Sequence, residues 1–371
     1  MSDLKKIFVP LKDPRSRRTK KHKFLEIIIL SILAVLAGAD SYDEIEQFGK
    51  EKIRFLRKFL DLRNGIPSHD TINRIFQMLD PTVFEQCFLD FTEFLKDSGA
   101  LNDQLKDQIA IDGKTVRGSR DSFHNKSPLH AVSAWSCHNS LCLGQVSCEA
   151  KTNEITTIPR LIDMLDIKSC VITIDAMGTQ TAIANKIIEK GGEYILAVKD
   201  NQPKLSEKVH LTCNTTTPVY DTNLVEKSHG RIETRRAEVF EYNPYVHGSR
   251  WKSWKSLIKI TSTREFHDGK KTSDVRYYIS SLESKSDFNR YIRSHWEIEN
   301  KLHWVLDMTF NEDSQRKRAK HSATNFAIVR KMALNIIKKD PGKGSLKGKR
   351  KMAGWNNNFL LELIGKCPNL F

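Results

Sequence analysis

The chain has 371 residues, well above the roughly 100 to 200 residues of one domain, so its length predicts two or three compact units. Apolar residues make up 39% and charged residues 28% of the chain, which excludes a largely disordered protein. The 60 basic residues exceed the 45 acidic ones and give a net charge of +15. This excess favours a polyanionic partner, nucleic acid rather than an acidic membrane.

No membrane contact is expected. The longest apolar run, Phe24 to Ala39, contains Glu26 and is shorter than the roughly twenty apolar residues of a membrane-spanning helix, so we predict a buried helix there. Residues 1–23 are polar and basic and lack a signal-peptide cleavage site. The seven cysteines include no C-x-x-C pair, which argues against a disulfide framework or a cysteine zinc site. We expect a protein of the reducing cytoplasm.

The first hundred residues have the apolar spacing of helices, over 24–37, 45–60 and 83–95. Between the last two, the segment GIPSHDTINRIFQMLD combines a turn, a capping residue and a short helix that carries Arg74. It is either a helix-turn-helix element that presents Arg74 to DNA or a connecting helix with a solvent-facing arginine. We therefore predict a helical region over 1–104 as a candidate DNA-binding region.

From residue 107 the pattern changes to short apolar runs typical of strands. Their order with the intervening helical segments is β, β, β, α, β, α, β, which predicts the α/β class, with a mixed five-stranded sheet covered by helices. Residues from about 203 to 284 predict a β-rich insertion, after which the helical period returns. The predicted catalytic domain spans 105–339, and the lysine-rich and glycine-rich residues 340–371 predict a basic flexible tail.

Two acidic residues end buried strands of this predicted sheet. Asp112 follows the run QIAI and Asp175 follows the run CVITI. A carboxylate at such a position is held rigidly at the sheet edge, where two of them can share a metal ion. Asp-Gly is also an ordinary turn dipeptide, so neither aspartate alone establishes a site.

The segment RSHWEIENKLHW supplies a third candidate acid. On an α-helix it places His295, Glu299 and His303 on one face, and Glu299 shares the side of Trp296 and Leu302 that should meet the sheet. The alternative is an ion-paired carboxylate on a core helix. A zinc site on His295, Glu299 and His303 is a further alternative, but their spacing differs from H-E-x-x-H and no fourth ligand is evident.

Three carboxylates suit phosphodiester chemistry. In-line displacement places charge on the attacking and leaving oxygens, and two Mg²⁺ ions about 3.5 to 4 Å apart stabilise both. Carboxylate oxygens are the ligands that these hard cations prefer. The predicted cofactor is therefore Mg²⁺, for which Mn²⁺ should substitute.

The chain resembles the H-repeat-associated proteins, a branch of bacterial insertion-sequence DDE transposases. The resemblance extends over about 24–337 and rests on the strings IAIDGKTVRGS, HAVSAW, TNEIT, VITIDAMGTQ, YILAVKDNQ, HGRIETR, YYISSL, IRSHWEIENKLHWVLDMTFNED and NFAIVRKMALN. It implies a ribonuclease-H-like core, metal-binding catalytic acids at Asp112, Asp175 and Glu299, and Mg²⁺-dependent DNA strand cleavage and strand transfer without a covalent intermediate. The implied partners are double-stranded DNA, as element ends and target, and a second copy of the chain in a homodimer on DNA.

The sequence departs from the wider group around the glutamate. Related transposases have a tyrosine and an arginine seven and four residues before it and a lysine seven residues after it, whereas this chain has Ile292, His295 and Leu306. Arg293 or His295 is the candidate replacement for the phosphate-contacting arginine. The H-repeat branch also includes degenerate elements, so a transposase-derived DNA-binding protein without catalysis is the alternative function.

Basic residues near these motifs are candidate phosphate contacts. For any one of them, a purely solvating surface role is the alternative. The candidates are Lys114, Arg117, Lys199, Arg231, Arg235, Arg293 and His295, together with the clusters RSRRTKKHK and RKRAK.

Overall fold

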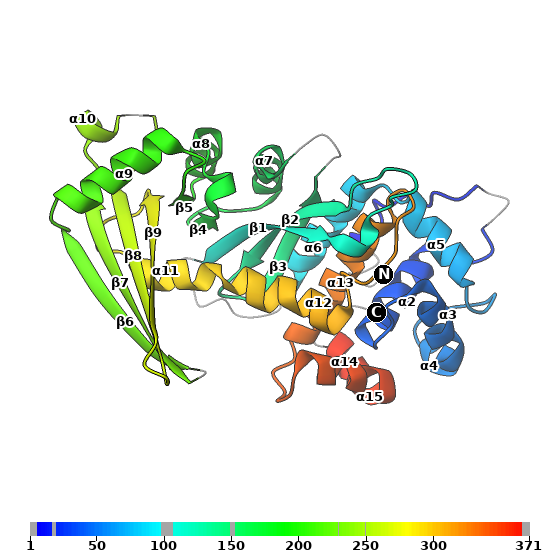
Figure 1. Ribbon diagram of the computed structural model, residues 1–371. Coiled ribbons are helices and arrows are strands. Elements are labelled where there is room, and N and C mark those ends of the chain that lie inside the picture. Colours follow the sequence, from blue (N-terminus) through cyan, green and yellow to red (C-terminus); the bar gives the residue numbers. More distant parts are fainter. Residues whose placement is uncertain are drawn as a thin grey trace.

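The computed structural model describes residues 6–16, 20–97, 107–148, 153–228, 230–248 and 250–365. One nine-stranded sheet, in the order β3-β2-β1-β4-β5-β9-β8-β7-β6, runs through the molecule. The N-terminal and C-terminal helices lie at one end of this sheet, and the last four strands lie at the other (Figure 1). The predicted α/β class is confirmed.

The first five strands form the predicted mixed sheet. They are β1 (Gln108–Val116), β2 (Leu129–Ser136), β3 (Leu141–Ser147), β4 (Val171–Ile174) and β5 (Glu193–Val198). Strand β1 lies parallel to β4 and antiparallel to β2, and β5 lies parallel to β4. Strand β4 ends at Ile174 beside Ile111, and β1 continues past it to Val116.

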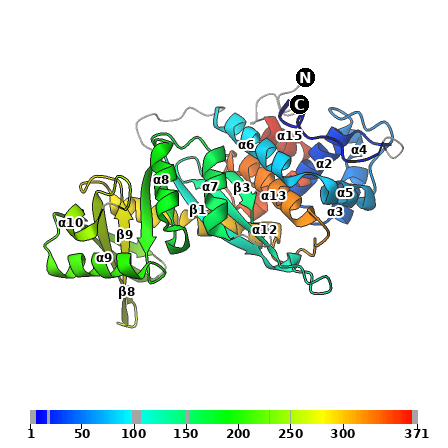
Figure 2. The same cartoon turned by 90° about the horizontal axis from the view of Figure 1, so that it is seen from above.

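The two faces of this sheet are covered by different helices (Figure 2). Ile109 and Ile111 pack in one apolar cluster with α7 (Glu154–Met164) and α8 (Thr181–Glu189). Ala110 packs in the other cluster, with the helices from 298 to 337. Because strand side chains alternate, Asp112 and Lys114 share the face of Ala110.

That second face is covered by a long helical segment with an irregular middle. It comprises α11 (Phe288–His295), a π-helix (Ile298–His303, labelled η4) and α12 (Trp304–Phe310). The buried helix α13 (Ser322–Lys338) follows and packs against α2 and α6 of the N-terminal region.

The predicted β-rich insertion extends the same sheet. Its strands are β6 (Tyr220–Ser228), β7 (Arg231–Glu241), β8 (Ser256–Phe266) and β9 (Lys271–Ser280), and β9 pairs antiparallel with β5. The insertion begins with a helix, α9 (Pro203–Thr215), which the sequence interpretation missed. Pro203 occupies the first turn of α9, where a proline is tolerated. The short helix α10 (Pro244–His247) lies between β7 and β8.

The N-terminal region is helical as predicted, with α2 (Phe24–Leu36), α3 (Tyr42–Glu51), α4 (Ile53–Leu56), α5 (His69–Met78) and α6 (Pro81–Asp97). Helix α2 is buried along almost its whole length. No helix among the described residues is long and apolar enough to cross a membrane. The Ser68 hydroxyl caps α5 by accepting the Thr71 amide, and Arg74 is exposed on this helix.

The predicted flexible tail over 340–371 is wrong for residues 346–365, which form α14 (Leu346–Trp355) and α15 (Asn357–Gly365). The Arg350 guanidinium donates hydrogen bonds to three main-chain carbonyls and pairs with one carboxylate; these partners are Val35, Ala39, Thr309 and Asp40. Leu360, Leu363 and Ile364 join the core. The lysine-rich composition led to the prediction of a solvent-exposed segment, but apolar residues spaced along these helices pack them against the core.

Candidate active site

Asp112 and Asp175 lie side by side where β4 ends. Ile111 of β1 pairs with Ile174, the last residue of β4, so Asp175 directly follows its strand. Asp112, predicted to end its strand, instead lies within β1, which continues to Val116 because it pairs with β2 over that length. The Asp175 side chain caps a short 3-10 turn, where its Oδ1 accepts the amides of Met177 at 3.1 Å and Gly178 at 3.4 Å. The turn thus fixes the orientation of this carboxylate.

Glu299 lies in the π-helical turn, not in the regular α-helix that the sequence predicted. A π-helix bonds residue i to i+5, so it changes the angular relation between His295, Glu299 and His303. His303 Nδ1 lies 3.5 Å from Asp112 Oδ2. The helix therefore contacts β1 at the first aspartate, and π-turns of this kind are frequent at functional sites.

The three acids line one cavity of about 520 Å³. It opens between the middle of β1, the ends of β4 and β5, residues of α9 and β9 in the insertion, and the helix that carries Glu299. Basic and aromatic side chains complete its wall; they include Lys199, His210, Arg276, Tyr277 and Trp296. The structure thus brings together three acids that are separated by 63 and 124 positions in the chain.

Burial and nearby negative charges raise the pKa of both aspartates. Burial, followed by the negative charge of Asp175, raises the pKa of Asp112 to about 7. Burial and the charge of Glu154 also raise the pKa of Asp175, while two backbone amides and Lys199 oppose the rise. A bound cation would remove this repulsion and favour the ionised carboxylates.

The donor set fits a hard divalent cation. The three predicted ligands are carboxylates, and Mg²⁺ takes only one or two of these while it keeps several waters and substrate oxygens. Among the described residues, no group of three or more His, Cys, Asp or Glu side chains forms a ready-made metal cage. The acids would therefore have to approach one another when an ion binds.

The two histidines of the alternative zinc site are buried, and His295 is engaged by a residue of β4. His295 Nδ1 lies 2.9 Å from Thr173 Oγ1 on β4, and burial lowers the His295 pKa to about 4. Burial, followed by the charges of Lys331 and Lys114, lowers the His303 pKa to about 3. Both imidazoles are neutral near pH 7. His295 thus lacks the charge of the arginine that it was considered to replace.

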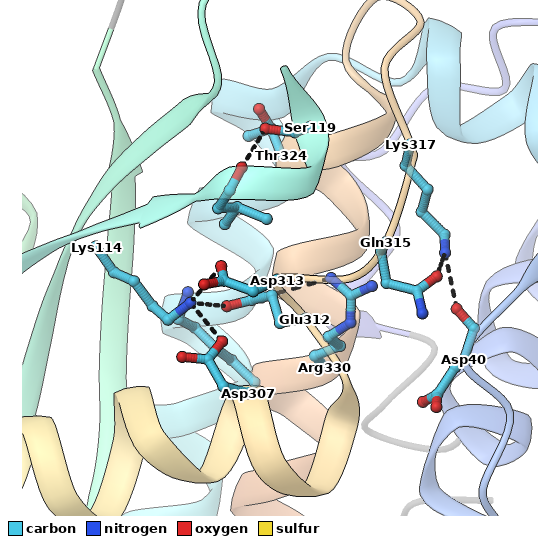
Figure 3. Close-up of polar contacts among 12 residues, drawn as sticks. Asp40, Lys114, Ser119, Asp307, Glu312, Asp313, Gln315, Lys317, Thr324 and Arg330 are labelled. Carbon is cyan, nitrogen blue, oxygen red and sulfur yellow. Dashed lines mark hydrogen bonds and ion pairs between the residues drawn. The ribbon is translucent and has the colours of Figure 1, made fainter. Parts of the chain in front are cut away.

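Lys114 is an internal ion-pair centre (Figure 3). Its ammonium lies 2.7 Å from Asp307, 3.3 Å from Glu312 and 3.2 Å from Asp313, and its side chain is only 10% exposed. Arg330 contacts the same Glu312 carboxylate at 3.4 Å. These contacts weigh against the predicted phosphate contact of Lys114, because its charge is already neutralised.

The other predicted phosphate contacts occupy different settings. Arg117 and Lys199 are exposed, and Lys199 lines the cavity of the acids. Arg231, Arg235 and Arg293 line an adjoining cavity of about 320 Å³. Arg235 is buried and pairs with Glu226 and Glu233 there. Within the cluster over 15–23, residues 17–19 lie outside the described residues.

The sequence interpretation missed Glu154 and His130, which lie beside the aspartates. Glu154 Oε1 and His130 Nε2 are 2.7 Å apart. Glu154 contributes to the raised pKa of both Asp112 and Asp175. The string TNEIT contains the start of α7, which Asn153 caps. Helical periodicity, however, gave no reason to place Glu154 near the two aspartates.

Comparisons with known proteins identify the family of this chain. The model of the transposase DDE domain matches residues 103–336, and the model of its DDE transposase-associated region matches residues 5–92. A solved piggyBac transposase in a synaptic complex with hairpin DNA aligns with a TM-score of 0.40 and 12% identity over 97% of this chain and 75% of that one. A structural similarity this low supports no conclusion.

Two curated relatives from Escherichia coli match nearly the whole chain. "Putative transposase YncI" of strain O157:H7 is 43% identical and covers 96% of this chain and 93% of its own length. "H repeat-associated putative transposase YhhI" of strain K12 is 40% identical and covers 95% of each chain. With two matching models and relatives of this extent, the chain belongs to the DDE transposase family and has its ribonuclease-H-like core.

Proposed function

We propose that this protein cuts and joins DNA strands during transposition of an insertion sequence, with Asp112, Asp175 and Glu299 as its metal-binding catalytic acids. The observation that carries this proposal is that these three carboxylates line one cavity. Asp175 follows the end of β4, Asp112 lies beside it on the parallel strand β1, and Glu299 comes from a π-turn that contacts β1. Family membership supplies the reaction class.

Each part of the cavity has a defined chemical task in this proposal. Two bound Mg²⁺ ions would stabilise the charge on the attacking and leaving oxygens of the phosphodiester, and Mn²⁺ should substitute. Asp112, Asp175 and Glu299 would hold these ions. Lys199 is exposed at the cavity wall and is placed to contact a phosphate of the bound strand.

Two loops form a basic surface beyond the end of β1. Lys126 Nζ donates to the carbonyls of Arg318 and Lys320, at 2.8 Å each, and so joins the loop after β1 to the loop after α12. Exposed Arg117, Arg120, Arg316, Arg318 and Lys320 surround this junction. We infer that duplex DNA extends from the acid cavity across this surface, in a homodimer on DNA in the bacterial cytoplasm.

The test is cleavage of a plasmid that carries the DNA flanking this gene, with Mg²⁺ or Mn²⁺. Asp175→Asn should reduce cleavage by at least 100-fold and leave DNA affinity within about twofold, because it removes a metal ligand and no DNA contact. The matched control is Asp268→Asn in the exposed β8–β9 turn, which should cleave normally.

The outcomes separate the two candidate functions. Full activity of Asp175→Asn would overturn the catalytic assignment. Specific binding without cleavage by the native protein, in both metals, would instead favour a DNA-binding protein that has lost catalysis.

A further inference from the structure

A fourth carboxylate approaches the acid site from the opposite face of the sheet. Glu154 is the first residue of α7, and its Oε1 lies 2.7 Å from Nε2 of His130 on β2. The other ring nitrogen of His130, Nδ1, lies 2.8 Å from Thr115 Oγ1 on β1. Both ring nitrogens are thus engaged, and this pair of contacts fixes the imidazole and the carboxylate that it holds.

Gly113 makes room for this carboxylate. A Cβ atom at position 113 would overlap Glu154 Oε1 and would lie 2.7 Å from His130 Nε2. Gly113 directly follows Asp112 on β1, so the Glu154 carboxylate lies against the strand immediately after the first catalytic acid. Any side chain at this position would displace it.

Helix α7 also packs on the turn that carries Asp175. A Cβ atom at Gly178 of this turn would lie 3.0 Å from Ile158 Cδ1 of α7 and would overlap Ile174. The same helix therefore fixes Glu154 relative to both aspartates.

We propose that Glu154, held by His130, is a fourth carboxylate ligand of the divalent-metal site, beside Asp112 and Asp175. The inference rests on the proposed function. Ligand carboxylates in metal sites are usually held by an outer hydrogen-bond partner, as His130 holds Glu154, and loss of such a partner typically costs ~10-fold to 100-fold in metal affinity.

The experiment titrates the DNA-free protein with Mn²⁺ alone and measures bound ion by electron paramagnetic resonance. Glu154→Gln should weaken Mn²⁺ binding by about 10-fold. Gly113→Ala should have a similar effect. This substitution removes no carboxylate from the protein, but the added methyl group displaces the carboxylate of Glu154. The Mg²⁺ concentration for half-maximal plasmid cleavage should rise in parallel in both variants.

Asp163→Asn is the matched control. Asp163 lies on the same helix, but its carboxylate is 57% exposed and pairs with Lys186, so its substitution should leave Mn²⁺ affinity unchanged. Circular dichroism confirms folding of each variant.

Native Mn²⁺ affinity in folded Glu154→Gln, together with a loss in Asp175→Asn, would overturn this inference and leave the proposed function intact. Native affinity and cleavage in Asp175→Asn would instead overturn the proposed function.

Discussion

The Asp112 carboxyl group changes its acidity when the chain folds. In the unfolded chain its pKa is near the ordinary value of about 3.9, whereas burial and the neighbouring Asp175 raise it to about 7 in the folded, metal-free protein. The folded state therefore binds a proton more tightly than the unfolded state. This contribution to stability is complete below about pH 4 and is lost as the pH rises through 7.

We therefore predict that Asp112→Asn removes a pH-dependent destabilisation. Between pH 4 and 7, the native protein in EDTA should lose stability relative to the variant by up to about 1.4 kcal/mol per pH unit, because asparagine carries no titrating proton. Urea unfolding of both proteins at pH 5 and pH 8 measures the difference. A difference that is the same at both pH values would contradict the raised pKa.

Among single residues, sequence patterns located some acids and missed others for definable reasons. Asp112 and Asp175 follow short apolar runs, and the parallel register of β1 and β4 places such positions together. Glu154 joins them only through the packing of α7 on Gly113 and Gly178. This packing joins segments that are far apart in the chain, and no periodic pattern in the sequence indicates such a contact.

At the scale of elements, Lys114 connects the strand of Asp112 to the segment that follows Glu299. Its ammonium contacts Asp307 on α12 and Glu312 and Asp313 in the next loop (Figure 3). Glu312 is fully buried. A buried carboxylate that loses a cationic partner retains its desolvation cost, so this contact stabilises the packing of the two elements.

Lys114→Met should lower the free energy of unfolding by about 3 kcal/mol, since it removes one partner of a buried ion-pair network. Urea denaturation measures the change. The matched control is Lys271→Met, whose partner Glu265 is 47% exposed and whose loss should cost less than about 1 kcal/mol. Equal losses in the two variants would show that the Lys114 network adds no more than a surface pair.

Element prediction succeeded where periodicity was regular. The strands β1 to β5 and the helix α2 follow simple apolar patterns, and the structure has them. The π-turn at Glu299 was not predicted because a helical pattern does not reveal the i to i+5 bonding. The helices over 346–365 were missed because the lysines of α14 led to a prediction of solvation for the whole segment, although apolar residues of α15 dock on the core.

At the scale of the whole molecule, the excess of positive charge is not spread evenly over the surface around the acid site. Exposed arginines surround the two joined loops near the N-terminal helices, and the loops approach closely because Gly118 faces the backbone oxygens of Asp313 and Gln315. In the β-rich insertion, many basic side chains are paired with acidic ones, as Arg235 is with Glu226 on the neighbouring strand. The loops, rather than the insertion strands, thus offer charge to DNA.

The combined substitution Arg316→Gln and Arg318→Gln should therefore weaken DNA binding and reduce its salt dependence. Each phosphate contact contributes about 0.9 to the slope of log affinity against log salt, so the loss of two contacts should lower the slope by about 2. Filter binding or fluorescence anisotropy with duplex DNA between 50 and 200 mM salt, in Ca²⁺ to prevent cleavage, measures this slope. The combined substitution Lys270→Gln and Lys271→Gln removes the same charge from the exposed β8–β9 turn and should leave the slope unchanged. An equal decrease in both variants would show that DNA responds only to total charge, whereas a decrease confined to the loop variant would establish the path of the duplex from the acid cavity toward the N-terminal helices.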